Sequence, residues 1–296
     1  MKIAFAGLGA MGRGMADNLI KAGHALTGFD VNPAVEGWLT GRGAAFAPSV
    51  AAACAGAEAL VAMVVNADQL ETVLFGATGA AGALPKGALI LSGVTVPTEA
   101  AQALGARAEA AGYAYLDCPV SGGAVGAEAG TLTLMAAGSD AAWQAAQPLL
   151  AVLGRNVYRL GDKPGAGSTM KMVHQLAAGC NLAVAAEVMS FGAHLGLEPA
   201  QVLEILNASA GASWMIANRG PRMLTEGETA SSAVDIFVKD LGIVLDAARA
   251  SRFPVPVSAA ALQVFLGASG AGFGKYDDSQ GTRFYEALGG KPVRKT

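Results

Sequence analysis

The order of apolar and helical patterns along the chain predicts an α/β protein, with a doubly wound, mostly parallel sheet followed by an all-α domain. Three observations predict it. Short β-like runs alternate with helical segments from Lys2 to Arg159, strand patterns stop after Gly161, and one long helical pattern covers Gly165–Leu195. We therefore expect one domain over residues 1–163 and a helical domain over residues 164–296, joined by the long helix.

The individual elements follow from local signals. The expected strands are Lys2–Ala6, Ala25–Asp30, Ala59–Val65, Ala88–Leu91, Tyr113–Asp117, Thr131–Ala137 and Asn156–Arg159. Helical segments lie between them; Pro97–Ala111, for example, begins with proline, has Glu99 in its first turn and is followed by Gly112. The expected later helices are Pro199–Asn207, Val234–Ala250 and Val255–Gly267.

Charge and hydropathy exclude several functional classes. The 296 residues include 20 Lys and Arg against 23 Asp and Glu, a formal charge of −3, and no basic block, so we expect no nucleic-acid partner and no anionic membrane surface. The uncharged run Phe253–Gly274 contains prolines and glycines and favours a soluble helix. Residues 1–12 have no cleavage pattern for secretion. We expect a cytoplasmic protein whose partner is a small molecule.

The numbers and spacing of the cysteines and glycines give two further indications. Cys54, Cys118 and Cys180 are widely spaced, which argues against a disulfide framework or a metal site and favours buried thiols. Glycine accounts for 40 of the 296 residues, about twice its usual share of ~7%. Such an excess suits tight turns and close helix packing, or loops that bind phosphate, and both explanations stay open.

A glycine-rich loop follows the first predicted strand. Gly7, Leu8, Gly9, Ala10, Met11 and Gly12 form the pattern G-x-G-x-x-G and open a helix. The glycines permit a tight turn and a close approach to a pyrophosphate, while the helix N-terminus supplies N–H groups, so the pattern predicts a Rossmann-type dinucleotide site. Asp30 ends the next predicted strand and favours NAD over NADP, unless it is only a turn or capping residue.

Candidate substrate residues lie in the second half of the sheet and in the helices. Ser121, Gly122 and Gly123 follow a strand, and their hydroxyl and backbone N–H groups suit a carboxylate, although the stretch taken alone favours a plain Pro/Gly turn. Lys171, His174 and Gln175 share one face of the long helix. A lysine in a partly dry cleft becomes a usable base because burial disfavours its charged form. Lys239 is a second candidate cation, or a lysine paired with Asp240.

With these residues assembled, the chain resembles the β-hydroxyacid dehydrogenase family, which includes 3-hydroxyisobutyrate dehydrogenase, nearly from end to end. The matching segments are the Gly7–Gly12 loop with Met15, Asn18 and Leu19, Asp117–Gly123, Gly167–Lys171 and Phe237–Leu241. The resemblance implies that Lys171 is the acid/base and that Ser121, Gly122 and Gly123 hold the substrate carboxylate. It also implies that Val64, Val65, Asn66 and Thr95 line the cofactor and that Lys239 lies near the nicotinamide.

One departure narrows the resemblance. The family usually has two asparagines where this chain has His174 and Gln175, and the substitution resembles the L-threonate dehydrogenase branch. That branch implies oxidation of the C2 hydroxyl of L-threonate, or of a close four-carbon sugar acid, with NAD. Tartronate semialdehyde reductase and 3-hydroxyisobutyrate dehydrogenase are the alternatives, and a non-catalytic NAD-binding protein is a more distant one. The apolar helical half predicts a homodimer or homotetramer.

Overall fold

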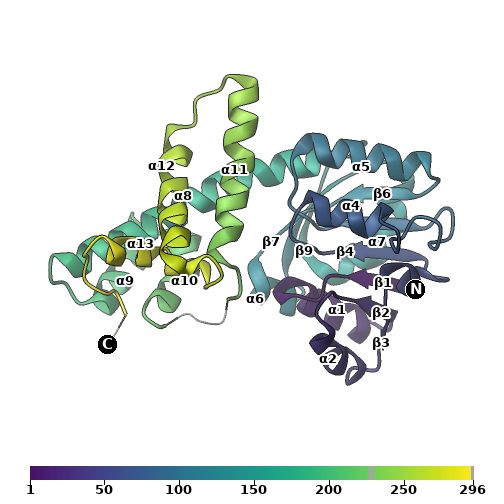
Figure 1. Ribbon diagram of the computed structural model, residues 1–296, viewed down its shortest axis with the longest axis horizontal. Helices are drawn as coiled ribbons and strands as arrows, with labels where there is room; N and C mark the ends of the chain where they lie inside the picture. The colour runs from purple at the N-terminus through teal and green to yellow at the C-terminus, as the bar shows by residue number, and fades with distance from the viewer. Residues whose placement is uncertain (227–229, 295–296) are drawn as a thin grey trace. The chain divides into compact units, whose positions relative to one another are not determined.

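The computed structural model describes residues 1–226 and 230–294 (Figure 1). The chain divides into two compact units, Met1–Lys171 and Met172–Thr296. The division falls a few residues after the boundary between residues 163 and 164 that the sequence suggests, and it lies within one continuous helix. The domain limits taken from the sequence stay a prediction.

The first unit contains a single mixed sheet. Six strands run parallel in the order β3-β2-β1-β4-β5-β6, and β8 continues the sheet antiparallel to β6 and β7, with β9 parallel to β8. The bounds are β1 (Lys2–Ala6), β2 (Ala25–Phe29), β3 (Ala45–Phe46), β4 (Ala59–Ala62), β5 (Leu89–Ser92), β6 (Ala114–Asp117), β7 (Val120–Ser121), β8 (Leu132–Ala137) and β9 (Gly154–Gly161). This arrangement confirms the predicted doubly wound, mostly parallel sheet.

Helices cover both faces of this sheet, as the ribbon in Figure 1 shows. Alternate residues of β1 explain the two layers, since Ile3 and Phe5 belong to one buried cluster while Ala4 and Ala6 belong to the other. The helices are α1 (Ala10–Lys21), η1 (Pro33–Val35), α2 (Glu36–Thr40), α3 (Val50–Cys54), α4 (Ala67–Phe75), α5 (Thr98–Ala110), α6 (Gly123–Glu128) and α7 (Asp140–Leu153). A strand buried on both faces can carry polar groups only at its ends, and ligands of such sheets bind there.

The second unit is helical, as the sequence predicts. Its described part contains an isolated bridge between Ala233 and Asp277 and otherwise no strand pairing. The elements are α8 (Ala166–His194), which begins in the first unit, α9 (Pro199–Asn207), α10 (Trp214–Met223), α11 (Val234–Ser251), α12 (Pro256–Ala268), η2 (Ser269–Phe273), η3 (Asp278–Gly281) and α13 (Thr282–Ala287). Leu182, Met189, Phe237, Leu241 and Phe265 lie in its apolar core.

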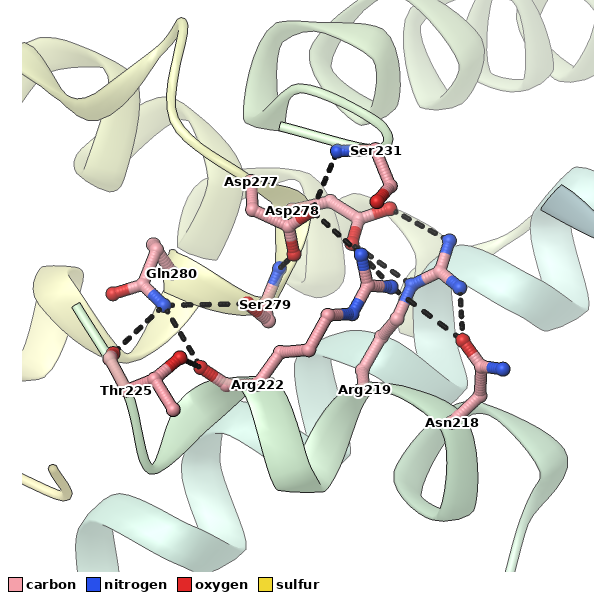
Figure 2. A network of polar contacts seen from close by, with 9 residues as sticks. All are labelled: Asn218, Arg219, Arg222, Thr225, Ser231, Asp277, Asp278, Ser279 and Gln280. Carbon is pink, nitrogen blue, oxygen red and sulfur yellow. Dashed lines mark hydrogen bonds and ion pairs between the residues drawn. The ribbon is translucent and has the colours of Figure 1, made fainter. Parts of the chain in front are cut away.

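A buried group of ion pairs joins α10 to the segment 277–280 inside this unit (Figure 2). Arg219 donates from Nε and Nη2 to both oxygens of Asp278, at 2.9 and 3.0 Å. Arg222 donates to Asp277 at 2.6 Å, and Asp277 also accepts from the backbone N–H of Ser231 at 2.9 Å. Paired guanidinium and carboxylate groups let a buried charge persist, so this contact fixes α10 against η3.

The structure corrects several element predictions. The strands β3 and β7 are absent from the predicted elements, because two-residue strands are too short to show an alternating pattern. The helix α10 is absent as well, because its last turn contains Gly220 and Pro221, residues that usually interrupt helices. The other predicted strands and helices agree with the structure to within a few residues at their ends.

Two helical segments are long and apolar enough to cross a membrane by length and composition alone. They are Ala166–His194, whose apolar 18-residue stretch is 56% buried in the protein, and Pro256–Phe273, whose 18 residues are 28% buried. Only the second is an uncharged run in the sequence, because Lys171 and Glu187 interrupt the first. Core helices of globular proteins satisfy the same criterion, and α8 contributes Leu182 and Met189 to such a core.

Candidate active site

The glycine-rich loop lies between β1 and α1. Gly7 has φ +96°, and a Cβ there would overlap the carbonyl of Met63, while a Cβ on Gly12 would overlap the carbonyl of Gly7. Gly9 precedes the first residue of α1, and nothing lies within 4 Å of the position its Cβ would take. The fold therefore requires glycine at positions 7 and 12, whereas position 9 leaves open the space in which a pyrophosphate would approach the backbone.

The other loop residues face in different directions. The Leu8 side chain is fully buried in the core of the sheet, so only its backbone can face a ligand. Ala10 and Met11 begin α1, where the first N–H groups have no partner within the helix. A helix N-terminus with these groups and open space before it fits a dinucleotide pyrophosphate.

Asp30 follows β2 and contacts the same loop. Its Oδ2 accepts from the Leu8 N–H at 2.6 Å, and its Oδ1 accepts from the Asn32 N–H at 2.8 Å. The second contact is the turn role that the sequence left open. A carboxylate has about four acceptor positions, so these two hydrogen bonds remain compatible with a ribose diol on the same oxygens.

The remaining cofactor candidates follow β4 and β5. Asn66 caps α4 by accepting from the Gln69 N–H at 2.9 Å, and the Val65 N–H donates to Gln69 Oε1 at 2.9 Å. Val64 is partly buried, Val65 is 47% exposed, and Thr95 lies between β5 and α5. Because β1, β4 and β5 are parallel, the residues after them lie at the carboxyl edge of the sheet, together with the glycine loop.

Asp117, at the end of β6, fixes the first turn of α8. One carboxylate oxygen accepts from the backbone N–H groups of Gly165 and Ser168, both at 2.9 Å, and the other accepts from Ser168 Oγ at 2.7 Å. Asp117 is 1% exposed, and burial raises the pKa of its carboxyl group even though these hydrogen bonds lower it. The carboxylate thereby holds the helix that carries Lys171.

Ser121, Gly122 and Gly123 connect β7 to α6. Ser121 ends the strand, Gly122 caps the helix with φ +131°, and Gly123 begins it with φ +63°. Both values lie in the region that glycine adopts at no steric cost, so the two glycines are needed for this turn. The structure shows the turn alternative to be real, and at Gly122 a Cβ would come within 3.2 Å of the Leu132 side chain.

Lys171, His174 and Gln175 all lie on α8, at the spacing that puts them on one helix face. Lys171 and Gln175 are each 7% exposed, which is unusual for such polar residues, while His174 is partly buried. Burying polar groups is costly unless they are hydrogen-bonded, so this face needs polar partners.

Asp240, on α11, supplies one of them. Its Oδ1 accepts from Lys239 Nζ at 2.5 Å, its Oδ2 accepts from the Gln175 side-chain amide, and the Gln175 carbonyl lies 2.9 Å from His174 Nδ1. Asp240 is 2% exposed. From the sequence, Asp240 is expected only as a possible partner of Lys239, and Asp117 has no individual role. The sequence signals that could have identified them are the position of Asp240 directly after a candidate lysine and the position of Asp117 at the end of a predicted strand.

The described residues contain no group of three or more His, Cys, Asp or Glu side chains placed to hold a metal ion. Of the cysteines, Cys54 and Cys118 are buried and Cys180 is partly exposed.

Comparisons with known proteins agree with this geometry. Residues 2–161 match the NAD binding domain of 6-phosphogluconate dehydrogenase, and residues 165–285 match the family model described as NAD-binding of NADP-dependent 3-hydroxyisobutyrate dehydrogenase. The fold, the glycine loop and these matches define an NAD-dependent hydroxyacid dehydrogenase.

Individual relatives cover almost the whole chain. The chain is 45% identical to the L-threonate dehydrogenase of Cupriavidus necator, over 97% of this chain and 96% of that protein. It is 40% identical to the L-threonate dehydrogenase of Escherichia coli strain K12, over 97% and 95%. The crystal structure of 3-hydroxyisobutyrate dehydrogenase from Salmonella typhimurium superposes with a TM-score of 0.91 at 42% identity, covering 95% of this chain and 98% of that one. The chain therefore belongs to the 3-hydroxyisobutyrate dehydrogenase-like family.

Proposed function

We propose that this dehydrogenase oxidises the C2 hydroxyl of L-threonate, or of a close four-carbon sugar acid, to the 2-keto acid. Two relatives that carry the name L-threonate dehydrogenase, at 45% and 40% identity over nearly the whole chain, support this substrate. The observation that carries the proposal is the polar pair His174 and Gln175 on α8: the two side chains are hydrogen-bonded to each other, and Gln175 also donates to Asp240 on α11.

The pair suits a substrate with several hydroxyl groups. Burying a hydroxyl without a hydrogen bond costs roughly 1–3 kcal/mol, so a sugar acid needs more polar partners than a branched aliphatic hydroxyacid does. An imidazole and an amide can supply such partners. In the proposal, His174 and Gln175 contact the hydroxyl groups beyond C2, and Lys239 contributes a positive charge near the substrate and the nicotinamide.

The chemistry needs a base and a carboxylate site. Lys171, as the neutral amine, takes the proton of the C2 hydroxyl while the C2 hydride leaves, and the C–O single bond becomes the carbonyl. NAD supplies the hydride acceptor. Ser121 and the backbone of Gly122 and Gly123 hold the substrate carboxylate in this assignment.

The proposed cofactor contacts follow the edge of the sheet described above. The backbone of Gly7 to Gly12, with Leu8, Ala10 and Met11 between the glycines, takes the pyrophosphate. Asp30 accepts from the ribose hydroxyls, and Val64, Val65, Asn66 and Thr95 line the rest of the dinucleotide. We expect NAD to be preferred over NADP because a 2′-phosphate would be repelled by the Asp30 carboxylate.

The role of Lys171 is tested by Lys171→Ala. Turnover of L-threonate should fall by orders of magnitude because the proton acceptor is lost, while NADH binding, measured by its fluorescence, stays within about twofold of the wild type. Lys163→Ala is the matched control, since Lys163 is an exposed lysine close in sequence. Unchanged turnover in Lys171→Ala would refute the assignment.

The substrate is tested by an absorbance screen of NAD and NADP reduction with threonate, erythronate, glycerate, 3-hydroxyisobutyrate and 4-hydroxybutyrate. For His174→Asn we expect a selective loss on the four-carbon sugar acids. An equal loss on all hydroxyacids would indicate a general proton-transfer or structural role for His174 instead.

The second candidate is oxidation of 3-hydroxyisobutyrate, the name carried by the Salmonella typhimurium structure. Reduction of tartronate semialdehyde is the other alternative within the same reaction class. A higher kcat/KM for 3-hydroxyisobutyrate than for threonate in the screen, or NADH oxidation specific to tartronate semialdehyde, would favour these activities.

We further propose that the enzyme is a cytoplasmic homodimer or homotetramer. Exposed apolar side chains recur along one face of α8, at Val173, Val184 and Phe191. A second copy of the chain would remove this stripe from water. Light scattering coupled to size-exclusion chromatography measures the mass, and a monomer at micromolar concentration would overturn this part of the proposal.

A further inference from the structure

We propose that Asp240 is a positioning residue that fixes His174 in the tautomer with its proton on Nδ1, so that Nε2 of the neutral imidazole is a hydrogen-bond acceptor. The inference concerns a relay of four side chains within the second unit: Lys239, Asp240, Gln175 and His174. Its consequence for substrate choice, but not the tautomer itself, rests on the proposed function.

The relay begins at the buried carboxylate. Asp240 is 2% exposed, and Lys239 Nζ lies 2.5 Å from its Oδ1. An ammonium group can only donate, and an ionised carboxylate can only accept. Lys239 therefore donates to Oδ1, and Oδ2 is left as an acceptor for the neighbouring helix.

The next step fixes the direction of the Gln175 amide. This side chain has one end that donates and one that accepts, and a rotation about its last bond exchanges them. The end that meets Asp240 Oδ2 must be the NH2 group, because two acceptors facing each other would repel. Gln175 is 7% exposed, so an unpaired amide end would be costly. The carbonyl end consequently faces His174.

The last step fixes the proton on the imidazole. The Gln175 carbonyl oxygen lies 2.9 Å from His174 Nδ1, and a carbonyl can only accept. Nδ1 must therefore carry the proton. Because a neutral imidazole has one N–H group, Nε2 then carries a lone pair. The choice of tautomer is made by a carboxylate on α11 that does not touch the imidazole.

This polarity explains how His174 can select a hydroxyl. An asparagine at the same position could rotate and offer either a donor or an acceptor, whereas the relay holds His174 as an acceptor. A substrate hydroxyl can donate to Nε2, but a methyl or methylene group cannot. Asp240 thus contributes to specificity for hydroxylated acids through His174, without contacting the substrate itself.

The tautomer can be measured without substrate, by long-range ¹H–¹⁵N NMR correlation spectra of the full chain labelled with ¹⁵N-histidine. The pH is set about two units above the ordinary histidine pKa of ~6.5, where the imidazole of a model peptide is neutral. We expect His174 to show a protonated Nδ1 and an unprotonated Nε2. His24 and His194, which lie outside the relay, are internal controls for the fold in every variant.

Asp240→Asn gives the decisive comparison, because it should invert the tautomer. Lys239 still donates, so the carbonyl of the introduced asparagine turns toward it and the new NH2 group faces Gln175. The Gln175 amide then rotates, its NH2 group faces His174, and the proton moves to Nε2. Lys239→Met is the matched control: it keeps the acceptor at Asp240 and should keep the proton on Nδ1.

Two results would overturn the proposal. One is a wild-type spectrum that shows the His174 proton on Nε2. This measurement does not depend on any variant folding. The other is an Asp240→Asn spectrum in which the His24 and His194 signals are unchanged and the His174 tautomer is also unchanged. If the tautomer is as expected but threonate neither shifts the Nε2 signal nor is oxidised, the relay stands and the proposed substrate is wrong.

Discussion

The carboxylate of Asp117 provides a test of how the first turn of α8 is held. Asp117→Ala removes three hydrogen bonds, those from the backbone N–H groups of Gly165 and Ser168 and from the Ser168 hydroxyl, at 2.9, 2.9 and 2.7 Å. Each is worth about 1 kcal/mol net, so the free energy of unfolding of the first unit should fall by about 3 kcal/mol. Ser168→Ala removes one of the three and should cost about 1 kcal/mol.

Asp117→Asn should behave differently because the two oxygens have different partners. The backbone N–H groups share one oxygen, which an asparagine carbonyl can replace, and the Ser168 hydroxyl can rotate to accept from the asparagine NH2 group. All three hydrogen bonds then survive without a buried charge. We expect Asp117→Asn to lie within about 1 kcal/mol of the wild type.

The pH dependence follows from the direction of the pKa shift. Burial raises the pKa of the Asp117 carboxyl group, so the folded state binds its proton more tightly than the unfolded state does. The stability that this group contributes is fully present below the unfolded value of ~3.9 and is lost as the pH rises through the folded pKa. Asparagine does not titrate, so the stability of Asp117→Asn relative to wild type should increase across the same interval.

The assay is equilibrium urea unfolding. A Trp214→Phe background leaves Trp38 and Trp143, so that fluorescence reports on the unit Met1–Lys171. Comparing Asp117→Ala, Asp117→Asn and wild type at neutral pH gives the two differences in the free energy of unfolding. If Asp117→Asn loses as much stability as Asp117→Ala, the carboxylate charge and not the hydrogen-bond geometry holds the turn, and the reasoning fails.

Three further predictions use other parts of the chain. Gly9→Ala should leave thermal stability unchanged and raise the Kd for NADH at least tenfold, whereas Gly12→Ala should lower stability because its Cβ overlaps a backbone carbonyl; melting curves and NADH titration separate the two. Arg219→Met should destabilise the second unit by about 3–5 kcal/mol, because the buried Asp278 loses both guanidinium hydrogen bonds and keeps the longer 3.8 Å ion pair with Arg222; the double variant with Asp278→Leu should recover much of the loss in urea unfolding. Cys54, whose pKa burial raises to about 12, should be alkylated only after unfolding, as peptide mass spectrometry can show, and fast labelling in the folded protein would contradict this.

Local patterns along the chain were sufficient to predict most of the helices and strands. The alternation of strands and helices, the glycine loop before α1 and the long apolar helix carrying Lys171 each depend on residues close in sequence. The short strands β3 and β7 were not predictable in this way because two residues carry too little periodicity, and α10 was hidden by its Gly220 and Pro221.

The candidate site also has a part that follows from local sequence and a part that does not. The sequence by itself determined the positions of the dinucleotide loop, of the lysine on the long helix and of the polar pair after it, because motif spacing and helical periodicity are local properties. Only the tertiary structure decided what holds those groups: Asp117 reaches Ser168 across 51 positions, and Gln175 reaches Asp240 across 65. Hydrogen bonds between such distant residues depend on how the elements pack, and no pattern in the chain specifies which buried carboxylate will meet which donor.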